Sequence, residues 1–373
     1  MKKILLYTDT PLVGGAEIQM FLLAKFLNKT MFQPILACSN FKELDRWCEN
    51  FEKEGIKVIR LKVKNKHDIR HYFQLKKIIK EEKIDILHLH VWNPASCRYG
   101  FKQSCVPIII TEHDPFKLSW FKDLIKKHLL ENVSKIITVS DDNKKLLQKA
   151  YPDHKDKITT IHNGIDITWW QSQLLRFTEE DRKKIKEELF EANENTLIIT
   201  SIAALHERKG LKYLIEAMPA LTKEFPNIKL IIVGEGPQKS ELENLISKFK
   251  LENHVKLLGQ QKETPKILKS SDIFVLPSLR EAFGLVNLEA MLAPLPILAS
   301  KVGGISEVVE DGKTGILIEP GNVEKFTEAL RALIISPEKR QKMAIAGQKR
   351  VLENFSAEKM AKEYEKIYGL TGE

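Results

Sequence analysis

Short apolar runs alternate with longer amphipathic stretches along the first half of the chain. The runs have the length of strands and end at turn-forming residues, and the stretches between them repeat apolar residues at helical spacing. This alternation predicts a parallel sheet with helices on both faces. The predicted strands cover Lys3–Thr8, Pro34–Cys38, Lys57–Arg60, Ile86–His90, Ile108–Thr111, Lys135–Val139 and Ile158–Ile161.

The same alternation begins again after a polar, charged stretch from Phe177 to Asn195. We therefore expect two α/β domains in tandem, joined near residues 165–195. Ligands of open parallel sheets bind beyond the carboxyl ends of the strands, so two such domains that face each other would place both edges in one cleft. The second set of predicted strands covers Thr196–Ala203, Ile228–Val233, His254–Leu258, Asp272–Leu276, Pro296–Ala299 and Gly315–Ile318.

Length and composition agree with two globular domains, because 373 residues with 43% hydrophobic and 29% charged content exceed one ordinary core. No apolar run approaches the roughly 18 residues that span a bilayer. The first run is too short for a signal peptide and meets Asp9 at once, so we expect a strand there. We then expect the cysteines to be reduced thiols of a cytosolic protein; they are Cys38, Cys48, Cys97 and Cys105.

The net charge is +9, and part of the excess lies in the stretch FKLSWFKDLIKKHLL at residues 116–130. Its apolar residues recur at helical spacing beside Lys122, Lys126 and Lys127. Two interpretations stay open, a solvated helix surface or a basic amphipathic face that rests on anionic lipid. No nucleic-acid-binding motif accompanies the charge, so we expect no nucleic-acid partner.

Two glycine-containing turns follow predicted strands. Gly14 and Gly15 precede an amphipathic helix, where backbone amides can approach an anion; a tight turn that needs positive φ is the alternative. The second turn, from Gly234 to Ser240, lacks glycines that a Walker A loop and a dinucleotide fingerprint require. We therefore expect neither an ATPase nor a nicotinamide-dependent dehydrogenase.

Histidines and an acid gather near the ends of two predicted strands. His88 and His90 share one face of a strand because side chains alternate along it, and Glu112 and His113 follow the next strand. Such a set resembles zinc ligands. Nothing in the sequence requires both pairs to face one point, so we expect no metal site.

Two adjacent cations, Arg208 and Lys209, stand between a strand and a helix of the second domain. A planar guanidinium fork and a point charge suit a diphosphate. A solvated loop is the alternative for this motif.

The segment EAFGLVNLE places Glu281 in a loop and Glu289 inside the helix that begins near Gly284. Amides at a helix start have no partner within the helix and offer an anion site. Glu289 is a bidentate acceptor for vicinal sugar hydroxyls. The amides concerned belong to Phe283, Gly284 and Leu285.

With these residues the chain resembles the retaining glycosyltransferases of the GT-B fold, glycosyltransferase family 4, which are relatives of glycogen and sucrose synthases. The resemblance spans nearly the whole chain, and its most specific motif is the pair of glutamates eight positions apart. The motifs are GGAE at 14–17, TEHD at 111–114, ITVSD at 137–141, HNGID at 162–166, RKG at 208–210, VGEGP at 233–237, EAFGLVNLE at 281–289 and GGISEVVEDGKTG at 303–315.

The resemblance implies two Rossmann-like domains that face a cleft. Residues 1–168 would bind the acceptor, residues 169–195 would connect the domains, and residues 196–355 would bind the nucleotide sugar. Residues 356–373 would carry a helix, Ser356 to Leu370, that packs back on the first domain.

The resemblance also implies the roles of the donor-binding residues in the second domain. Arg208 and Lys209 would hold the diphosphate, and Glu289 would bind the ribose hydroxyls. Glu281 would face the transferred sugar, together with the amides of residues 283–285, which would also meet the distal phosphate.

The first domain would contribute to the same site. Gly14 and Gly15 would approach the phosphate across the cleft, and His113 would contact the donor sugar. Many relatives carry Gly-Arg-Leu where this chain has Ala203-Ala204-Leu205. That arginine is usually a phosphate ligand, so we expect Arg208 to replace it; a weakened donor site is the alternative.

The resemblance finally implies a retaining, metal-independent transfer of a sugar from a nucleotide-diphosphate donor to a glycan or lipid-linked acceptor, in polysaccharide, lipopolysaccharide or glycolipid synthesis. We expect no cofactor besides the donor, and a UDP-sugar in preference to a GDP-sugar. The expected location is cytoplasmic, with contact to the inner face of the cell membrane as an option. Two alternatives stay open, a non-catalytic nucleotide-sugar-binding protein and a sugar-nucleotide epimerase on the same fold.

Overall fold

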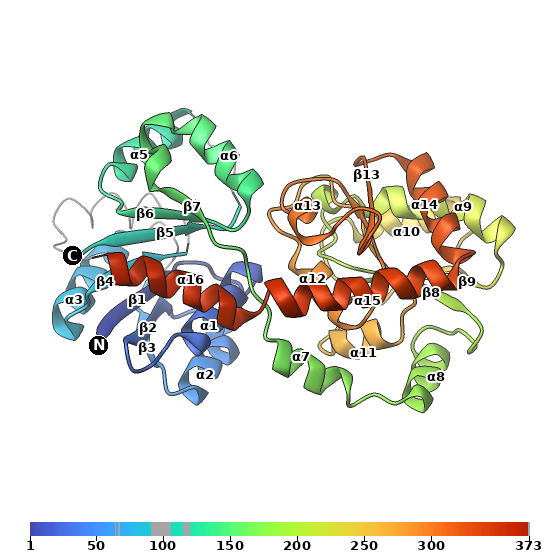
Figure 1. Cartoon of the computed structure of the whole chain (residues 1–373), viewed down its shortest axis with the longest axis horizontal. Coiled ribbons are helices and arrows are strands. Elements are labelled where there is room, and N and C mark those ends of the chain that lie inside the picture. The colour runs from blue at the N-terminus through green and yellow to red at the C-terminus, as the bar shows by residue number, and fades with distance from the viewer. Residues whose placement is uncertain (64, 66–67, 91–105, 115–119, 372–373) are drawn as a thin grey trace. The chain divides into compact units, whose positions relative to one another are not determined.

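The computed structural model of the chain describes residues 1–63, 65, 68–90, 106–114 and 120–371. It divides into two compact units (Figure 1). Unit 1 comprises Met1–Gly164 together with the chain from Ala357 onward, and unit 2 comprises Ile165–Ser356. Cys97 and Cys105 lie outside the described residues.

In unit 1, seven strands of the described part form a parallel sheet in the order β3-β2-β1-β4-β5-β6-β7. The chain thus starts in the middle, moves outward to β3, and returns beside β1 with β4. The strands are β1 (Lys2–Thr8), β2 (Phe32–Ser39), β3 (Lys57–Leu61), β4 (Ile86–Leu89), β5 (Ile108–Glu112), β6 (Lys135–Thr138) and β7 (Ile158–Thr160). The helices are α1 (Gly15–Phe26), α2 (Asp45–Lys53), α3 (Arg70–Glu82), α5 (Trp120–Leu130), α6 (Asp141–Ala150) and α16 (Ala357–Leu370), with 3-10 turns at Lys42–Leu44 and Pro152–Lys157.

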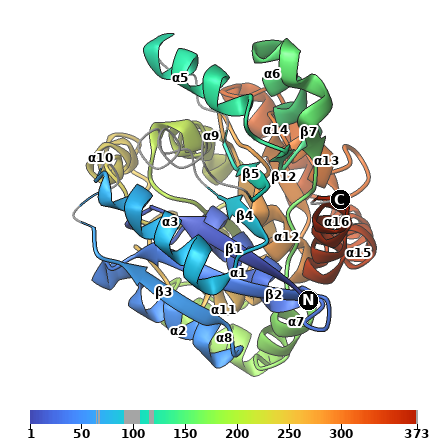
Figure 2. The same ribbon diagram turned by 90° about the vertical axis from the view of Figure 1, so that its left-hand side faces the viewer.

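Helices cover both faces of this sheet, and each face has its own apolar core (Figure 2). Successive side chains of β1 point to opposite faces, so Ile4 and Leu6 join the core beneath α1, α2 and α16, whereas Leu5 and Tyr7 join the core beneath α3, α5 and α6. Burial on both sides explains why the strands are continuous apolar runs in the sequence.

The C-terminal helix α16 belongs to unit 1, where it packs against α1. Its Tyr364 hydroxyl lies 3.0 Å from Thr111 Oγ1, and its Tyr368 hydroxyl lies 2.6 Å from His88 Nδ1. The ammonium group of Lys2 donates to the carbonyl oxygens of Tyr368, Gly369 and Thr371 at 3.0–3.1 Å. These bonds satisfy carbonyls that the end of a helix leaves open.

Unit 2 contains a second parallel sheet, of six described strands in the order β10-β9-β8-β11-β12-β13. The strands are β8 (Leu197–Ile202), β9 (Ile228–Val233), β10 (Val255–Leu257), β11 (Ile273–Leu276), β12 (Ile297–Ser300) and β13 (Gly315–Ile318). The helices are α7 (Ile167–Leu174), α8 (Glu179–Glu188), α9 (Leu211–Glu224), α10 (Lys239–Lys248), α11 (Thr264–Lys269), α12 (Leu285–Leu292), α13 (Ile305–Val308), α14 (Val323–Ile334) and α15 (Pro337–Asn354), with a 3-10 turn at Glu207–Lys209.

The polar stretch at residues 169–195, expected to be a connector, is part of unit 2. It forms most of α7 and all of α8, and Ile185 and Phe190 pack with Ile198 of β8 in one apolar cluster. Arg182 also pairs with Asp272 at 2.5 Å. The sequence does not reveal this packing, because most residues of the stretch are charged and a narrow apolar stripe of α8 is enough to bind it to the rest of unit 2.

Candidate active site

The two central strands of unit 2, β8 and β11, mark the point where the strand order reverses. From β8 the chain proceeds outward to β9 and β10, and from β11 it proceeds outward in the other direction to β12 and β13. The loops after β8 and β11 therefore leave neighbouring strands in opposite directions at the carboxyl edge, which is where open parallel sheets bind ligands.

These two loops are tied together. The backbone amides of Leu279 and Arg280 donate to the carbonyl oxygen of Arg208 at 2.8 and 3.3 Å. The ammonium group of Lys209 forms an ion pair with the carboxylate of Glu281, and these side chains are only 13% and 12% exposed. Two residues that the sequence assigned to diphosphate and sugar are thus brought together, while the side chain of Arg208 is exposed.

The close approach of these two loops depends on a glycine. Gly210 begins helix α9 with φ of +63°, and a Cβ atom there would lie 2.1 Å from the carbonyl oxygen of Pro277. No side chain fits at that distance without displacing the β11 loop. The glycine of the RKG motif therefore sets how near Lys209 stands to Glu281.

A second glycine starts helix α12. Gly284 has φ of +81°, and its missing side chain leaves room for Asn287 Nδ2, which lies 2.7 Å from the position of a Cβ atom. The helix begins at Leu285, so the amides of residues 283–285 precede its internal hydrogen bonds, as expected. The ring of Phe283 is buried and packs edge-on against Phe355, with ring centroids 5.9 Å apart.

Glu289 lies in the second turn of α12 and is partly buried. Burial raises the pKa of its carboxyl group to about 7, because the charged form loses hydration. Two residues before it, Asn287 is fully buried, and neither polar atom of its amide has a hydrogen-bond partner among the described residues. No role for Asn287 was predicted from the sequence; a polar residue within an otherwise apolar helix was the available signal.

In unit 1, Gly14 and Gly15 lie where β1 leads into α1, but a carboxylate already occupies part of this turn. The amide of Gly14 donates to Glu17 Oε2 at 2.9 Å, and Glu17 is only 4% exposed. Burial raises the pKa of the Glu17 carboxyl group. An anion could use the amide of Gly14 only if Glu17 released it.

His113 follows β5 and is partly exposed, and its Nε2 atom lies 3.1 Å from Nδ1 of His90. His88, His90 and His113 thus do converge. They do not form the zinc site considered for this set, because both ring nitrogens of His88 are hydrogen-bonded, to Tyr368 and Thr111.

Glu112, the acidic residue of that set, is paired with a lysine. Both carboxylate oxygens of Glu112 accept from the ammonium group of Lys126 at 2.8 Å. Lys126 is 3% exposed, so this lysine is not part of a solvated or lipid-facing surface as the sequence suggested. A buried charge needs such a partner.

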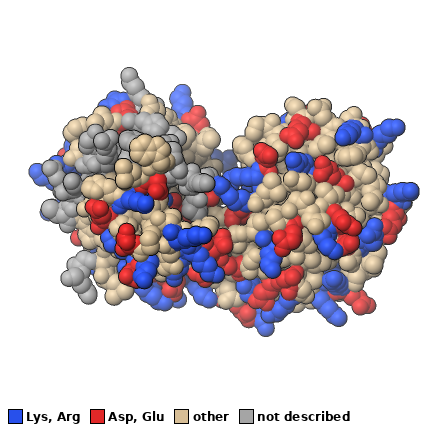
Figure 3. Space-filling view, turned by 90° about the horizontal axis from the view of Figure 1, so that it is seen from above, with Lys and Arg blue, Asp and Glu red and all other residues tan. Residues whose placement is uncertain are grey.

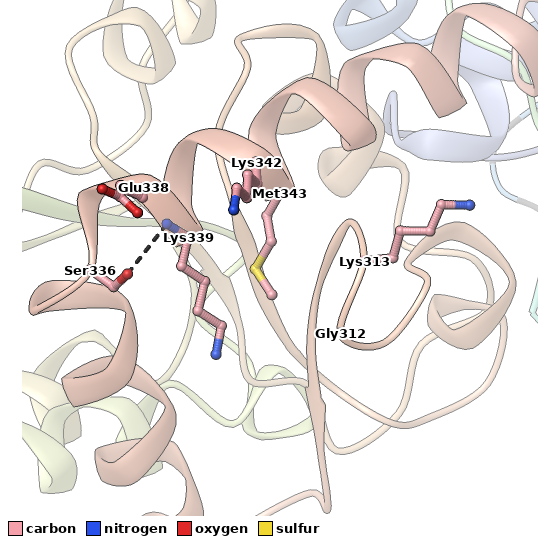
Figure 4. A pocket seen from close by; sticks show the side chains of 7 residues that line it. All are labelled: Gly312, Lys313, Ser336, Glu338, Lys339, Lys342 and Met343. Atoms are coloured by element: carbon pink, nitrogen blue, oxygen red, sulfur yellow. Dashed lines mark hydrogen bonds between the residues drawn. The ribbon is translucent and has the colours of Figure 1, made fainter.

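A cavity of about 260 Å³ in unit 2 lies away from these loops (Figure 4). Three lysines are among the residues that line it. Lys313 precedes β13, and Lys339 and Lys342 belong to the first turns of α15. Since β13 runs parallel to β12, its start lies at the edge opposite the carboxyl ends. This cavity therefore does not include the predicted donor residues.

Two family comparisons cover most of the chain. The family described as glycosyl transferases group 1 matches residues 181–350, and glycosyltransferase family 4 matches residues 13–169. The chain is 29% identical over 310 residues to N-acetyl-alpha-D-glucosaminyl L-malate synthase of Bacillus anthracis, covering 81% of this chain and 79% of that protein.

Two further similarities extend this result. The chain is 28% identical to the UDP-Gal:alpha-D-GlcNAc-diphosphoundecaprenol alpha-1,3-galactosyltransferase of Escherichia coli, covering 70% of each chain. Its fold matches the crystal structure of Anabaena HepE in complex with UDP and glucose with a TM-score of 0.84 and 22% identity, over 99% of this chain and all of that one.

The sheets and their carboxyl-edge loops define a two-domain enzyme of the GT-B fold, as predicted. The chain belongs to the group 1 glycosyltransferases. It is a glycosyltransferase that uses a nucleotide-sugar donor.

Replacement of Gly210 by Ala should weaken both the fold of unit 2 and donor binding. Gly312→Ala is a matched control, because Gly312 has φ of +73° but no atom within 4 Å of a Cβ position. Both substitutions should lower the free energy of unfolding by about 1–2 kcal/mol, because alanine is disfavoured at positive φ. Gly210→Ala should lower it by about 1–3 kcal/mol more, because its Cβ atom clashes with Pro277. Urea unfolding measures the difference. Equal losses of stability in the two variants would show that the loop after β11 moves aside without cost.

Glu289 should make the protein less stable as the pH rises. The pKa of its carboxyl group is about 7 when folded and near 4.5 when unfolded. The folded state therefore binds more protons between these values, so the contribution of this group to the free energy of unfolding falls as pH rises from about 4.5 to about 7.

Urea unfolding of wild type and Glu289→Gln across this range checks the sign. Relative to wild type, the free energy of unfolding of Glu289→Gln should rise by up to about 3 kcal/mol as the pH goes from about 4.5 to about 7. The exposed Glu243→Gln, on α10, should follow the wild-type slope. A Glu289→Gln curve parallel to wild type would refute the shifted pKa.

Proposed function

We propose that the protein is a retaining glycosyltransferase that moves a sugar from a nucleotide-diphosphate donor, UDP-linked in preference to GDP-linked, to a glycan or lipid-linked acceptor. The observation that carries the proposal is the convergence of Lys209, Glu281 and the first amides of α12 at the carboxyl ends of β8 and β11. Cations and amides suit the diphosphate, and the carboxylates suit hydroxyl groups.

The order of groups along α12 supports an order along the donor. The amides of residues 283–285 stand at the positive end of the helix, which favours phosphate. Glu289 lies one turn further, where its carboxylate could accept hydrogen bonds from both ribose hydroxyls. Glu281 precedes these amides along the chain, is paired with Lys209, and would face the transferred sugar.

Charge development at the leaving diphosphate is the main electrostatic demand of the reaction. Arg208, Lys209 and the α12 amides would stabilise it, and removing one preorganised donor of this kind typically costs about 3–4 kcal/mol. We assign this role to the protein groups, so the proposed transfer is metal-independent. The acceptor would attack from the face of the leaving phosphate, and trapping a covalent sugar adduct on Glu281 would refute this front-face route.

An acceptor on a lipid carrier is part of the proposal. The similar galactosyltransferase of Escherichia coli is named for a diphosphoundecaprenol acceptor. In this chain Trp120 and Leu124 of α5 are 79% and 58% exposed, and Lys127 lies beside them on the same helix. This surface supports contact with anionic lipid during polysaccharide or glycolipid synthesis at the cytoplasmic face of the membrane.

Two observations limit that contact. Basic and acidic side chains are interspersed on the face shown in Figure 3 rather than separated by sign. None of the described helices is long and apolar enough to cross a membrane. Any association would therefore rest on a few side chains and a partial charge excess.

Leu124→Asp should lower binding to vesicles that contain anionic lipid several-fold, because it places a negative charge on the apolar side of this surface. Leu175→Asp is the matched control, since Leu175 is 84% exposed but lies in unit 2. Sedimentation with vesicles measures both. Equal binding by wild type and Leu124→Asp would remove the membrane from the proposal.

A binding protein without catalysis is the second candidate. It is favoured by the exposed Ala204, which stands where many relatives have a phosphate-binding arginine. Such a protein would bind a nucleotide sugar and release no nucleotide. An epimerase would instead convert the donor alone.

A panel of UDP-, GDP- and ADP-sugars, incubated with a chelator and scored for nucleotide release and donor products, separates these functions. We expect release with a UDP-sugar that the chelator does not reduce. Affinity without release would favour the binding protein, and release that returns only with Mg²⁺ would refute metal independence.

With the active donor, Glu289→Ala should raise the donor Kd about tenfold or more, the cost of lost hydrogen bonds to a charged group. Glu281→Ala should mainly lower kcat, by about a hundredfold. The exposed Glu243→Ala should change neither. An unchanged donor Kd in Glu289→Ala would contradict the assignment of ribose to this residue.

A further inference from the structure

Three imidazole rings form a row at the centre of the unit 1 sheet. His88 lies on β4, His90 directly follows it, and His113 directly follows the neighbouring β5. The ring centroids of His88 and His90 are 4.2 Å apart, and those of His90 and His113 are 5.4 Å apart with an interplanar angle of 26°. The row lies next to the point between β1 and β4 where the strand order reverses.

One end of the row is fixed by its hydrogen bonds. His88 lies 2.6 Å from the hydroxyl of Tyr368 through Nδ1 and 2.8 Å from Thr111 Oγ1 through Nε2. A hydroxyl can donate or accept, so either tautomer of His88 is satisfied. These two hydrogen bonds hold the His88 ring in place beside His90, and they are compatible with either tautomer of His88.

His90 has no such freedom. It is 3% exposed, its Nδ1 lies 3.1 Å from Nε2 of His113, and its own Nε2 has no hydrogen-bond partner among the described residues. Burial lowers the pKa of His90 well below its ordinary value and that of His113 to about 4. Both rings are therefore neutral near pH 7, and each carries one N–H group.

A single N–H group must lie between the two rings, which leaves two arrangements. If His113 donates from Nε2, the proton of His90 lies on its buried Nε2 and has no acceptor among the residues that the structure describes. If His90 donates from Nδ1, its buried Nε2 is only a lone pair. Buried N–H groups without partners are rarer in proteins than under-satisfied acceptors, so the second arrangement is favoured.

We propose that His90 is a positioning residue that donates from Nδ1 to His113 Nε2 and thereby holds the proton of His113 on Nδ1. His113 then offers a fixed N–H donor to an oxygen of the bound sugar, rather than a lone pair. The proposal deepens the role of His113 in sugar contact and rests on the proposed function for its effect on turnover. Its effect on the tautomer rests on the geometry alone.

Nitrogen-15 NMR of the histidine rings tests the tautomer in the full-length protein without donor. The His113 signals are assigned as those that vanish in His113→Gln. We expect Nδ1 to be protonated in wild type. In His90→Leu the constraint is gone, and His113 should shift toward the Nε2–H form that an unconstrained neutral histidine side chain prefers.

Two further variants separate positioning from packing. The amide nitrogen of Asn falls near Nδ1 of a histidine, and that of Gln falls near Nε2. His90→Asn should therefore keep the Nδ1–H tautomer of His113 and kcat within about threefold of wild type, whereas His90→Gln and His90→Leu should lose about tenfold or more in kcat. A purely structural role would move Asn and Gln variants alike.

Each outcome bears on the proposal. An Nε2–H tautomer of His113 in wild type, or an Nδ1–H tautomer that persists in His90→Leu, would overturn it. If His90→Leu does not fold, the wild-type spectrum and His90→Asn still decide. An altered tautomer with unchanged kcat would refute the link to turnover, whereas absence of nucleotide release by wild type would count against the proposed function and leave the NMR result standing.

Discussion

The contact between the loops that follow β8 and β11 is the constraint on which the candidate site depends. Parallel pairing of these strands places both loops at one edge of the sheet, and the hydrogen bonds to the Arg208 carbonyl hold them in register. Gly210 lets the backbones meet. Only then do Lys209 and Glu281, which are far apart in sequence, share one ion pair.

Several groups of the site are held in states that suit a ligand better than the unliganded protein. Lys209 is neutralised by Glu281, the carboxyl group of Glu289 has a raised pKa, and the amide of Asn287 is buried without a partner among the described residues. The desolvated carboxyl group of Glu289 and the unpaired amide of Asn287 each cost stability. A ribose would provide hydrogen-bond donors to the carboxyl group of Glu289, and a diphosphate would compete with Glu281 for Lys209, which is the expected mark of a binding site rather than of a structural core.

The sheet pattern and the motif residues could be predicted from the sequence because both are local. The alternation of elements predicts the parallel sheets, and EAFGLVNLE places Glu281 and Glu289 before and within one helix. The order of the strands, which makes β8 and β11 neighbours, was not predicted. The burial of Lys126 could not be predicted, because its partner Glu112 belongs to another element. Nor could the capture of the Gly14 amide by Glu17 be weighed against anion binding, since that depends on how deeply the carboxylate is buried.

The chain passes between the two units at Gly164–Ile165 and again at Ser356–Ala357. Within unit 2 these crossings are joined, because the amide of Ile165 donates to the carbonyl oxygen of Phe355 at 2.9 Å, and Phe355 packs on Phe283 of the donor segment.

Within unit 1 the chain continues as α16, whose Tyr364 and Tyr368 reach Thr111 and His88 beside the imidazole row. Ring packing, the chain from Phe355 into α16, and hydrogen bonds thus connect the helix start that would bind phosphate to the imidazole row that contains His113. Each end of this connection is anchored by packing or hydrogen bonds inside its own unit.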